Sequence, residues 1–263
     1  MRMPVRQDSL RLGVLGPAQA EHDGRWTVPP TRQVGRIVTV LAGWPAEPVD
    51  RDRIIVAVWG DRQPETVVNT LQVHVSHVRR WLGKDAVRYR SGAYTLDLDP
   101  QSIDIYRFDG LLEAAADRRR EGDSTAATEI LTTAMALVRG TAFPDVSDPD
   151  LMARRSRIAE RVDQARADLL ECRLETVTDD LELADVIASA REQVSRHPRR
   201  ESSYAVLMRA LAVANRLSDE GEVFRQASAA LAADGLQVSE RLRDLHEQCQ
   251  QRDPLLVPGS LRS

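Results

Sequence analysis

The chain has 263 residues, of which 42% are hydrophobic and 29% are charged, and its formal net charge is −4. This acidic balance excludes a protein coated with basic residues for general nucleic-acid binding, and no apolar run approaches the ~18 residues that span a membrane. The first ten residues also lack the apolar segment of a signal peptide, so the sequence predicts a cytoplasmic protein.

Positive charge is concentrated toward the N-terminus. Residues 1–104 hold 14 Arg+Lys against 12 Asp+Glu, a balance of +2, whereas the remainder holds 22 against 28, a balance of −6. Residues 62–90 alone carry six basic and two acidic side chains, a balance of +4. This is a local footprint for an anion. Because Lys84 is the only lysine in the sequence, the number of arginines by itself proves little.

The first elements are predicted from an alternating pattern around Asp23-Gly24, a strong hairpin-turn signal. The pattern predicts strands near residues 11–19 and 25–28. A helix should follow from Thr31, whose hydroxyl can cap it, and should end before Pro45.

Two more helices and a second hairpin follow. The second helix should begin at Asp50 as its N-cap and stop at Gly60, and the third should run from Pro64, in its first turn, to Leu82. Residues 87–96 then indicate two short strands around Ser91-Gly92. Strands, three helices and a hairpin are the layout of a winged helix-turn-helix, whose last helix enters the DNA major groove and whose hairpin forms the wing.

The rest of the chain has only helical periodicity. The polar segment 97–102 predicts a domain boundary, with a DNA-binding domain over residues 1–100 and an all-helical domain over residues 101–263. Three helix openings resemble one another weakly, which suggests paired helices stacked as in tetratricopeptide repeats. The predicted fold class is therefore mainly α, an α+β winged helix followed by an all-α tetratricopeptide-like domain. The expected helices cover residues 106–120, 124–138, 148–176, 181–196, 201–216, 219–233 and 239–251.

The third helix has two distinct faces on a wheel of about 100° per residue. Its core side is an apolar band roughly 60° wide, formed by Leu71, Val75, Val78 and Leu82. The opposite band holds Asn69, Val73, Ser76 and Arg80, flanked by Thr66 and His77, with Gln72 and Arg79 near the border. These side chains suit base and phosphate edges, since Asn and Gln can pair with adenine, Arg with guanine or phosphate, and a valine with a thymine methyl.

Each of these residues also has an ordinary structural interpretation. An exposed valine is normal on any surface, and two arginines at a helix C-terminus complement its dipole. In the wing, Arg88 and Arg90 alternate with apolar neighbours and should point to one side, where phosphate or minor-groove contact competes with simple solvation. The combination of wing, helix order and local charge favours DNA binding over the structural interpretation.

Other chemistry is not indicated. His74 and His77 are spaced as a possible metal pair, but no further ligand lies near them in the sequence. Cys172 and Cys249 lack metal or redox spacing and are expected to be packing residues. The phosphate-loop, nucleophile-elbow, zinc-protease and dinucleotide motifs are missing from the sequence, so we expect no enzyme, no cofactor and no metal.

The segments RLGVLGP, IIVAVWGD, NTLQVHVSHVRRWLG and RYRSGAYTL together closely resemble the SARP family of antibiotic-pathway regulators. LVRGTAFPDV, HPRRESSYAVLMRAL and GLQVSERLRDLH resemble landmarks of that family's second domain, so the resemblance covers residues 10–255. It implies an OmpR-type winged helix, the type of output domain found in two-component regulators, followed by a bacterial transcriptional activation domain of tetratricopeptide-like form.

Membership of this family implies a pathway-specific transcriptional activator of antibiotic or secondary-metabolite genes. Such a protein binds direct repeats in double-stranded promoter DNA near the −35 element and recruits RNA polymerase through its sigma factor and other subunits. A second copy of the chain could occupy the neighbouring repeat. Together with the wheel, the resemblance gives the predicted DNA-binding residues: Thr66, Asn69, Thr70, Gln72, Val73, Ser76, His77, Arg79, Arg80, Arg88 and Arg90.

The sequence departs from the family pattern at three places. The family usually has an aromatic residue where His74 stands and an arginine where His77 stands, so a permanently charged phosphate or base contact is expected to be lost at His77, with an effect on sequence preference. Near the C-terminus, residues 237–239 replace the usual Asp-Pro-Gly. Two alternatives stay open: a protein-binding scaffold with a degenerate winged helix, and a repressor. The long loop around residues 59–63 favours polymerase contact and hence activation.

Overall fold

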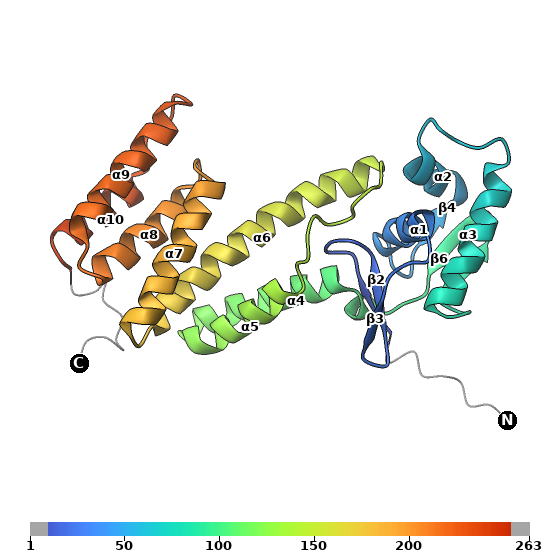
Figure 1. Cartoon of the computed structure of the whole chain (residues 1–263), viewed down its shortest axis with the longest axis horizontal. Helices are drawn as coiled ribbons and strands as arrows, with labels where there is room; N and C mark the ends of the chain where they lie inside the picture. The colour runs from blue at the N-terminus through green and yellow to red at the C-terminus, as the bar shows by residue number, and fades with distance from the viewer. Residues whose placement is uncertain (1–9, 254–263) are drawn as a thin grey trace. The chain divides into compact units, whose positions relative to one another are not determined.

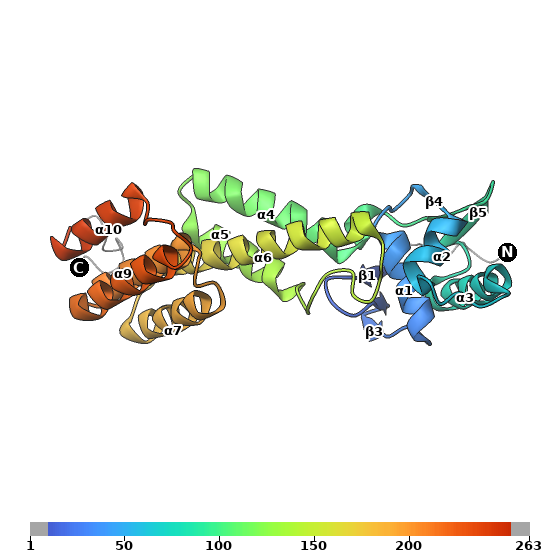
Figure 2. The ribbon, with the colours of Figure 1, turned by 90° about the horizontal axis from the view of Figure 1, so that it is seen from above.

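The computed structural model describes residues 10–253, and Figures 1 and 2 show the order of its helices and strands. Contacts divide the chain into two compact units. The first contains residues up to 113 together with residues 133–162, and the second contains residues 114–132 and the chain from residue 163 onward. The N-terminal residues 1–9, on which the argument against a signal peptide depends, lie outside the described range, as do residues 254–263.

The first sheet is antiparallel, in the order β1-β2-β3, with strands β1 (Arg11–Gly13), β2 (Gln19–His22) and β3 (Arg25–Thr27). The hairpin predicted at Asp23-Gly24 is confirmed. Both turn residues have positive φ, 50° and 80°, as a two-residue hairpin turn requires.

The strand predicted over residues 11–19 is wrong in its extent, because it breaks into β1 and β2. In the intervening loop, the N–H groups of Val14 and Leu15 donate to the two carboxylate oxygens of Asp104, at 2.8 and 2.9 Å. Gly16 adopts a φ of 134° and turns the chain back. The hydrogen bonds that would extend the strand are thus made to a side chain far along the sequence.

The winged helix is completed by α1 (Arg32–Ala42), β4 (Pro48–Asp50), α2 (Arg51–Trp59), α3 (Val67–Leu82), β5 (Val87–Arg90) and β6 (Ala93–Leu96). Thr31 caps α1 as predicted, its hydroxyl accepting a hydrogen bond from the Val34 N–H at 3.2 Å. The second sheet has the order β4-β6-β5. Strand β4 was not predicted, because three residues carry no periodicity and its existence depends on pairing with β6.

Two helix starts differ in detail from the prediction. Asp50 is the N-cap of α2, but its side chain makes no capping hydrogen bond. Helix α3 begins at Val67, after a turn that contains Pro64, and Thr66 is its N-cap residue. The predicted end of α3 at Leu82 is confirmed, with Gly83 following at a φ of 112°.

The second part of the chain is helical, as predicted. A 3₁₀ turn at Pro100–Ser102 precedes the helices, which are α4 (Asp104–Arg120), α5 (Ser124–Ala136), α6 (Pro149–Thr176), α7 (Asp180–Arg196), α8 (Glu201–Val213), α9 (Leu217–Ala232) and α10 (Glu240–Gln250). The expected helix 201–216 ends earlier, because Asn215 takes a positive φ of 56°. Both cysteines are buried, and burial raises the pKa of the Cys172 thiol to about 11 and that of Cys249 to about 12.

The core of the second unit lies among the end of α6 and helices α7 to α10, around the fully buried Tyr204. Its hydroxyl donates to the carbonyl of Pro198 at 2.8 Å, so the buried polar group is satisfied. The first compact unit contains the winged helix, the start of α4, the end of α5 and the first half of α6. Each compact unit is thus made of two separate stretches of the chain, so the units do not correspond to a single boundary. The predicted domain boundary near residue 100 stays a prediction.

Candidate nucleic-acid interface

Helix α3 is held in the winged helix by its apolar side. The four predicted core residues are all buried, with exposed fractions between 0% for Leu71 and 3% for Leu82. They pack mainly against α1, whose own buried face includes Ile37 and Leu41. Burying a leucine side chain contributes on the order of 2 kcal/mol, so this seam sets the rotation of α3 about its axis.

The opposite side of α3 is open to solvent. Asn69, Gln72, Val73, Ser76 and Arg80 are exposed, and Val73 keeps 55% of its surface accessible. The predicted division into a buried and an exposed face is therefore confirmed. That the exposed face contacts DNA stays a prediction from the chemistry of its side chains.

Some of the predicted site residues are engaged within the helix itself. The hydroxyl of Thr70 donates to the carbonyl of Thr66 at 3.1 Å, and the hydroxyl of Ser76 donates to the carbonyl of Gln72 at 3.0 Å. Because each hydroxyl already donates its proton to a helix carbonyl, it can only accept a further hydrogen bond. The amino group of a base can donate such a bond, whereas a phosphate oxygen cannot.

Arg79 is tied to the wing. Its Nε donates to the carbonyl of Val87, the first residue of β5, at 2.9 Å, and its side chain is half-buried. Arg80, the next residue, is exposed and makes no ion pair within residues 10–253. The two adjacent arginines thus have different environments, one linking α3 to the wing and one free for an external anion.

The wing also has one arginine with a partner in the protein and one without. Its turn is formed by Ser91 and Gly92, with φ values of 51° and 86°, as predicted for a two-residue hairpin. Arg88 pairs with Asp97 at 2.7 Å, whereas Arg90 is exposed and unpaired in the part of the chain that the structure describes. The pairing partially neutralises Arg88, so Arg90 is the stronger candidate for contact with DNA.

The two histidines of α3 lie side by side but differ in environment. Their ring centroids are 6.1 Å apart in an edge-on arrangement, and His74 also lies 6.2 Å from the ring of Trp59. Burial, and next the nearby His77, lower the pKa of His74. No group of three or more His, Cys, Asp or Glu within residues 10–253 is arranged to hold a metal ion.

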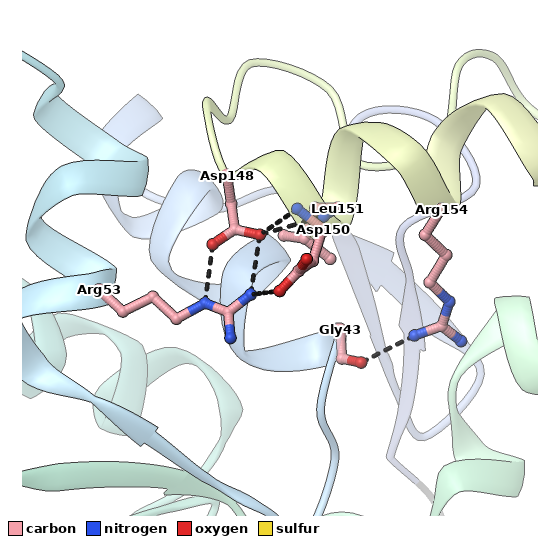
Figure 3. Close-up of polar contacts among 6 residues, drawn as sticks. All are labelled: Gly43, Arg53, Asp148, Asp150, Leu151 and Arg154. Atoms are coloured by element: carbon pink, nitrogen blue, oxygen red, sulfur yellow. Dashed lines mark hydrogen bonds and ion pairs between the residues drawn. The ribbon is translucent and has the colours of Figure 1, made fainter.

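Helix α2, the first helix of the helix-turn-helix, is fixed from the side by the start of α6 (Figure 3). The guanidinium of Arg53 donates to both carboxylate oxygens of Asp148, at 2.7 and 3.0 Å, and to Asp150 at 2.6 Å. The Arg53 guanidinium also stacks over the ring of Trp44, 3.9 Å from its centroid. We call Arg53, Asp148 and Asp150 the α2–α6 anchor.

Asp148 is the most buried member of the anchor, with 4% of its side chain exposed. It accepts backbone hydrogen bonds from Asp150 and Leu151, so it caps α6 while it binds Arg53. Burial alone would raise the pKa of Asp148, but the hydrogen bonds from Arg53 and the Leu151 N–H outweigh this and lower it. The carboxylate is therefore held in its charged form.

Close packing accompanies the anchor. Leu151 lies against Gly43, where a Cβ atom would come within 2.5 Å of the leucine Cδ2. The same glycine's carbonyl accepts a hydrogen bond from Arg154 at 2.7 Å, as Figure 3 shows. Both helices against which α3 packs, α1 and α2, are therefore bound to the start of α6.

A separate set of hydrogen bonds joins the first sheet to the loop after α5. Arg139 donates to the carbonyl of Pro17 at 2.7 Å and to Asp104 at 3.2 Å, while its own N–H donates to the carbonyl of Leu15. The segments RLGVLGP and LVRGTAFPDV, which carry the family resemblance, therefore meet in this structure. Burial raises the pKa of Asp104, opposed by the Val14 and Leu15 N–H groups and by Arg139.

Sequence reasoning did not identify the α2–α6 anchor. The Asp148-Pro149-Asp150 sequence carries a helix-start signal, and that start was predicted. Nothing local indicates that the capping aspartate also binds an arginine 95 positions earlier. Such a partner is visible only when α2 and α6 are placed side by side.

Comparison with known proteins matches both parts of the chain to family models. Residues 103–250 match the bacterial transcriptional activator domain, and residues 26–91 match the C-terminal domain of transcriptional regulatory proteins. The transcriptional regulator RedD of Streptomyces coelicolor is 30% identical over 270 residues, covering 96% of this chain and 74% of RedD. The chain belongs to the SARP family.

Other relatives agree with this membership. The regulatory protein DnrI of Streptomyces peucetius is 29% identical over 260 residues, covering 93% of each chain. The regulatory protein AfsR of Streptomyces coelicolor is also 29% identical, but the match spans only 25% of its length. In structure, this SARP-family regulator resembles Mycobacterium tuberculosis EmbR in complex with a low-affinity phosphopeptide, with a TM-score of 0.81 and 24% identity over 94% of this chain and 66% of the EmbR chain.

These matches show a DNA-binding transcriptional regulator and not an enzyme. The match to the regulatory-protein model over residues 26–91 includes α3 and β5, the first strand of the wing. Within residues 10–253, the regulator has no helix long and apolar enough to cross a membrane.

Proposed function

We propose that this regulator activates transcription of an antibiotic or other secondary-metabolite gene cluster, binding direct repeats near the −35 element and recruiting RNA polymerase through sigma. We call the exposed side of α3, with Asn69, Gln72, Val73, Ser76 and Arg80, the recognition face. The observation that carries the proposal is the combination of this solvent-exposed face with a match to the activator domain over residues 103–250. The relatives DnrI and RedD, described as a regulatory protein and a transcriptional regulator, support the same role.

In this proposal α3 enters the major groove and the wing follows the DNA backbone. Base edges are read by Asn69, Gln72, Val73 and Ser76, with Thr66 and Thr70 at the start of the helix. Arg80 and Arg90 supply charge that no carboxylate of the described chain neutralises. An arginine without an ion pair in the protein can bind a DNA phosphate and release its counterion, and this release makes the affinity depend on salt concentration.

The loop between α2 and α3 is the candidate surface for polymerase. Residues 61–66 are all exposed, and the nearby Val56 on α2 is 53% exposed. An exposed loop on a rigid support is where partner contacts commonly lie. The α2–α6 anchor holds the helix from which this loop leaves.

The first test is a footprint on the promoters that flank the protein's own gene, with salt titrated. The wild-type protein should protect spaced direct repeats near a −35 element. Arg80→Ala should bind about tenfold more weakly and lower the slope of log affinity against log salt by about one. Arg225→Ala removes an equal charge from the exposed surface of α9, where Arg225 pairs with Glu222, and should bind like the wild type.

Transcription from the protected promoter with purified RNA polymerase then separates activation from repression. Increased transcript supports the proposal, whereas decreased transcript establishes the repressor alternative. Wild-type protein that protects no site at moderate salt would overturn the proposal and favour the protein-scaffold alternative. Unchanged binding by Arg80→Ala would show that the recognition face is assigned to the wrong side of α3.

A further inference from the structure

A groove of about 320 Å³ runs beside the C-terminal half of α3. One wall is α3 and the other is the segment that connects β3 to α1. The lining residues are Val28, Pro30, Thr31, His77, Arg80 and Trp81. The apolar wall is well supported, since the Trp81 indole N–H donates to the hydroxyl of Thr27 at 2.9 Å.

His77 belongs to both this groove and the recognition face. On the helical wheel it lies about 40° from Val73, the most exposed of the apolar residues on α3. Its side chain is partly exposed and makes no hydrogen bond or ion pair to any residue in the described range. Both of its ring nitrogens are therefore available to a ligand.

The groove around His77 is lined by a positive group and by no carboxylate. Among the six lining residues Arg80 is the other charged side chain, and the wall from β3 to α1 contributes no titratable group. On α2, Trp59 lies beside His74, with their ring centroids 6.2 Å apart. His74 itself has a buried Nδ1 without a hydrogen-bond partner within residues 10–253, and burial, followed by the nearby His77, lowers its pKa.

A histidine ordinarily titrates near pH 6.5, inside the physiological range. An anion beside an imidazole favours its charged form and raises its pKa. The neutral ring offers one N–H donor and no charge, whereas imidazolium offers two donors and a positive charge. With no carboxylate in the groove to stabilise that charge, an anion must come from outside the groove.

We propose that His77 is a proton-dependent contact to DNA, which binds a phosphate oxygen or the acceptor edge of a guanine in its protonated form. The inference rests on the proposed function and specifies how the same face is regulated. DNA binding then takes up a proton, so affinity increases as the pH falls and decreases as the pH rises. Arg80 supplies the part of the attraction that does not change with pH.

The test measures affinity for the footprinted promoter fragment by fluorescence anisotropy between pH 5.8 and 8.0 at constant ionic strength. Wild-type affinity should rise about tenfold from pH 8 to pH 6, since one linked proton changes affinity at most about tenfold per pH unit. His77→Arg should bind at pH 8 as the wild type binds at pH 6, and His77→Gln should bind weakly at both. Both variants should lose most of the pH dependence.

Calorimetry in buffers of different ionisation enthalpy counts the protons directly. The wild type should take up a fraction of a proton near pH 7, and His77→Gln should take up less. A pH dependence that persists unchanged in His77→Gln would overturn the inference while leaving DNA binding established. Binding by no variant at any pH would overturn the proposed function and this inference together.

Discussion

The arginines of the first compact unit form two groups that differ in what surrounds them. At the α2–α6 anchor, Arg53 is bound by a buried carboxylate and stacked on an indole. On the recognition face of α3 and on the wing, Arg80 and Arg90 extend into solvent without an ion pair in the described chain. The same residue type therefore stabilises the fold in one place and is left available for a ligand in the other.

The difference follows from desolvation. A buried carboxylate such as Asp148 is costly unless a cation and hydrogen bonds satisfy it, so its arginine cannot be released without loss of stability. Exposed arginines are screened by water and salt and contribute little to folding. Their charge becomes strongly favourable only when a polyanion approaches. The comparison predicts that substitutions in the two groups affect different measurements.

The largest effect is expected at the anchor. Arg53→Met leaves Asp148 buried without its cation and should lower the free energy of unfolding by about 3 kcal/mol, measured by urea denaturation. Arg51→Met is the matched control two residues earlier, because Arg51 pairs only with Asp52, whose side chain is 80% exposed. The control should unfold at nearly the same urea concentration as the wild type, because an exposed ion pair contributes little to stability. If the two variants lost the same free energy of unfolding, the anchor would contribute no more to stability than an exposed ion pair.

A smaller effect is expected at Arg79, which lies on the border between the two groups. Arg79→Ala removes the hydrogen bond to the Val87 carbonyl and should destabilise the protein by about 1.5 kcal/mol. Its neighbour Arg80→Ala should leave stability nearly unchanged while weakening DNA binding. A denaturation curve and a binding curve on each variant separate these effects. If Arg79→Ala were as stable as the wild type, Arg79 would belong with the free arginines.

The wing allows the same comparison within one strand. Arg90→Ala should weaken DNA binding about fivefold, because this charge has no partner in the described protein. Arg88→Ala should have less effect, since Asp97 already compensates Arg88. Equilibrium binding at two salt concentrations tests the order. A larger loss in Arg88→Ala would mean that Asp97 positions Arg88 for DNA rather than neutralising it.

The smallest effect concerns His74, whose ring lies beside that of His77 and whose Nδ1 is buried. Because burial lowers the pKa of His74, the unfolded chain takes up a proton more readily, and stability should fall as the pH drops below about 6.5. In His74→Phe the melting temperature should depend less on pH between 7 and 5. Identical pH profiles of the melting temperature in the two proteins would show that His74 does not carry this acid sensitivity.

Local patterns predicted most of the secondary structure. Hairpins at Asp23-Gly24 and Ser91-Gly92, the Thr31 cap and the apolar seam of α3 depend on neighbours in sequence, and all are found. The break in the first strand and the existence of β4 were missed, because each depends on a partner that is distant in the sequence.

The sequence by itself determined the order of elements, the amphipathic rotation of α3, the family membership and the chemistry of the residues on the recognition face. Periodicity, turn residues and caps act over a few positions, so one chain suffices to reveal them. Only the tertiary structure decided which arginines are free. Arg53, Arg79, Arg88 and Arg90 are alike in sequence, and the distinction arises from carboxylates, carbonyls and burial that folding brings to each of them.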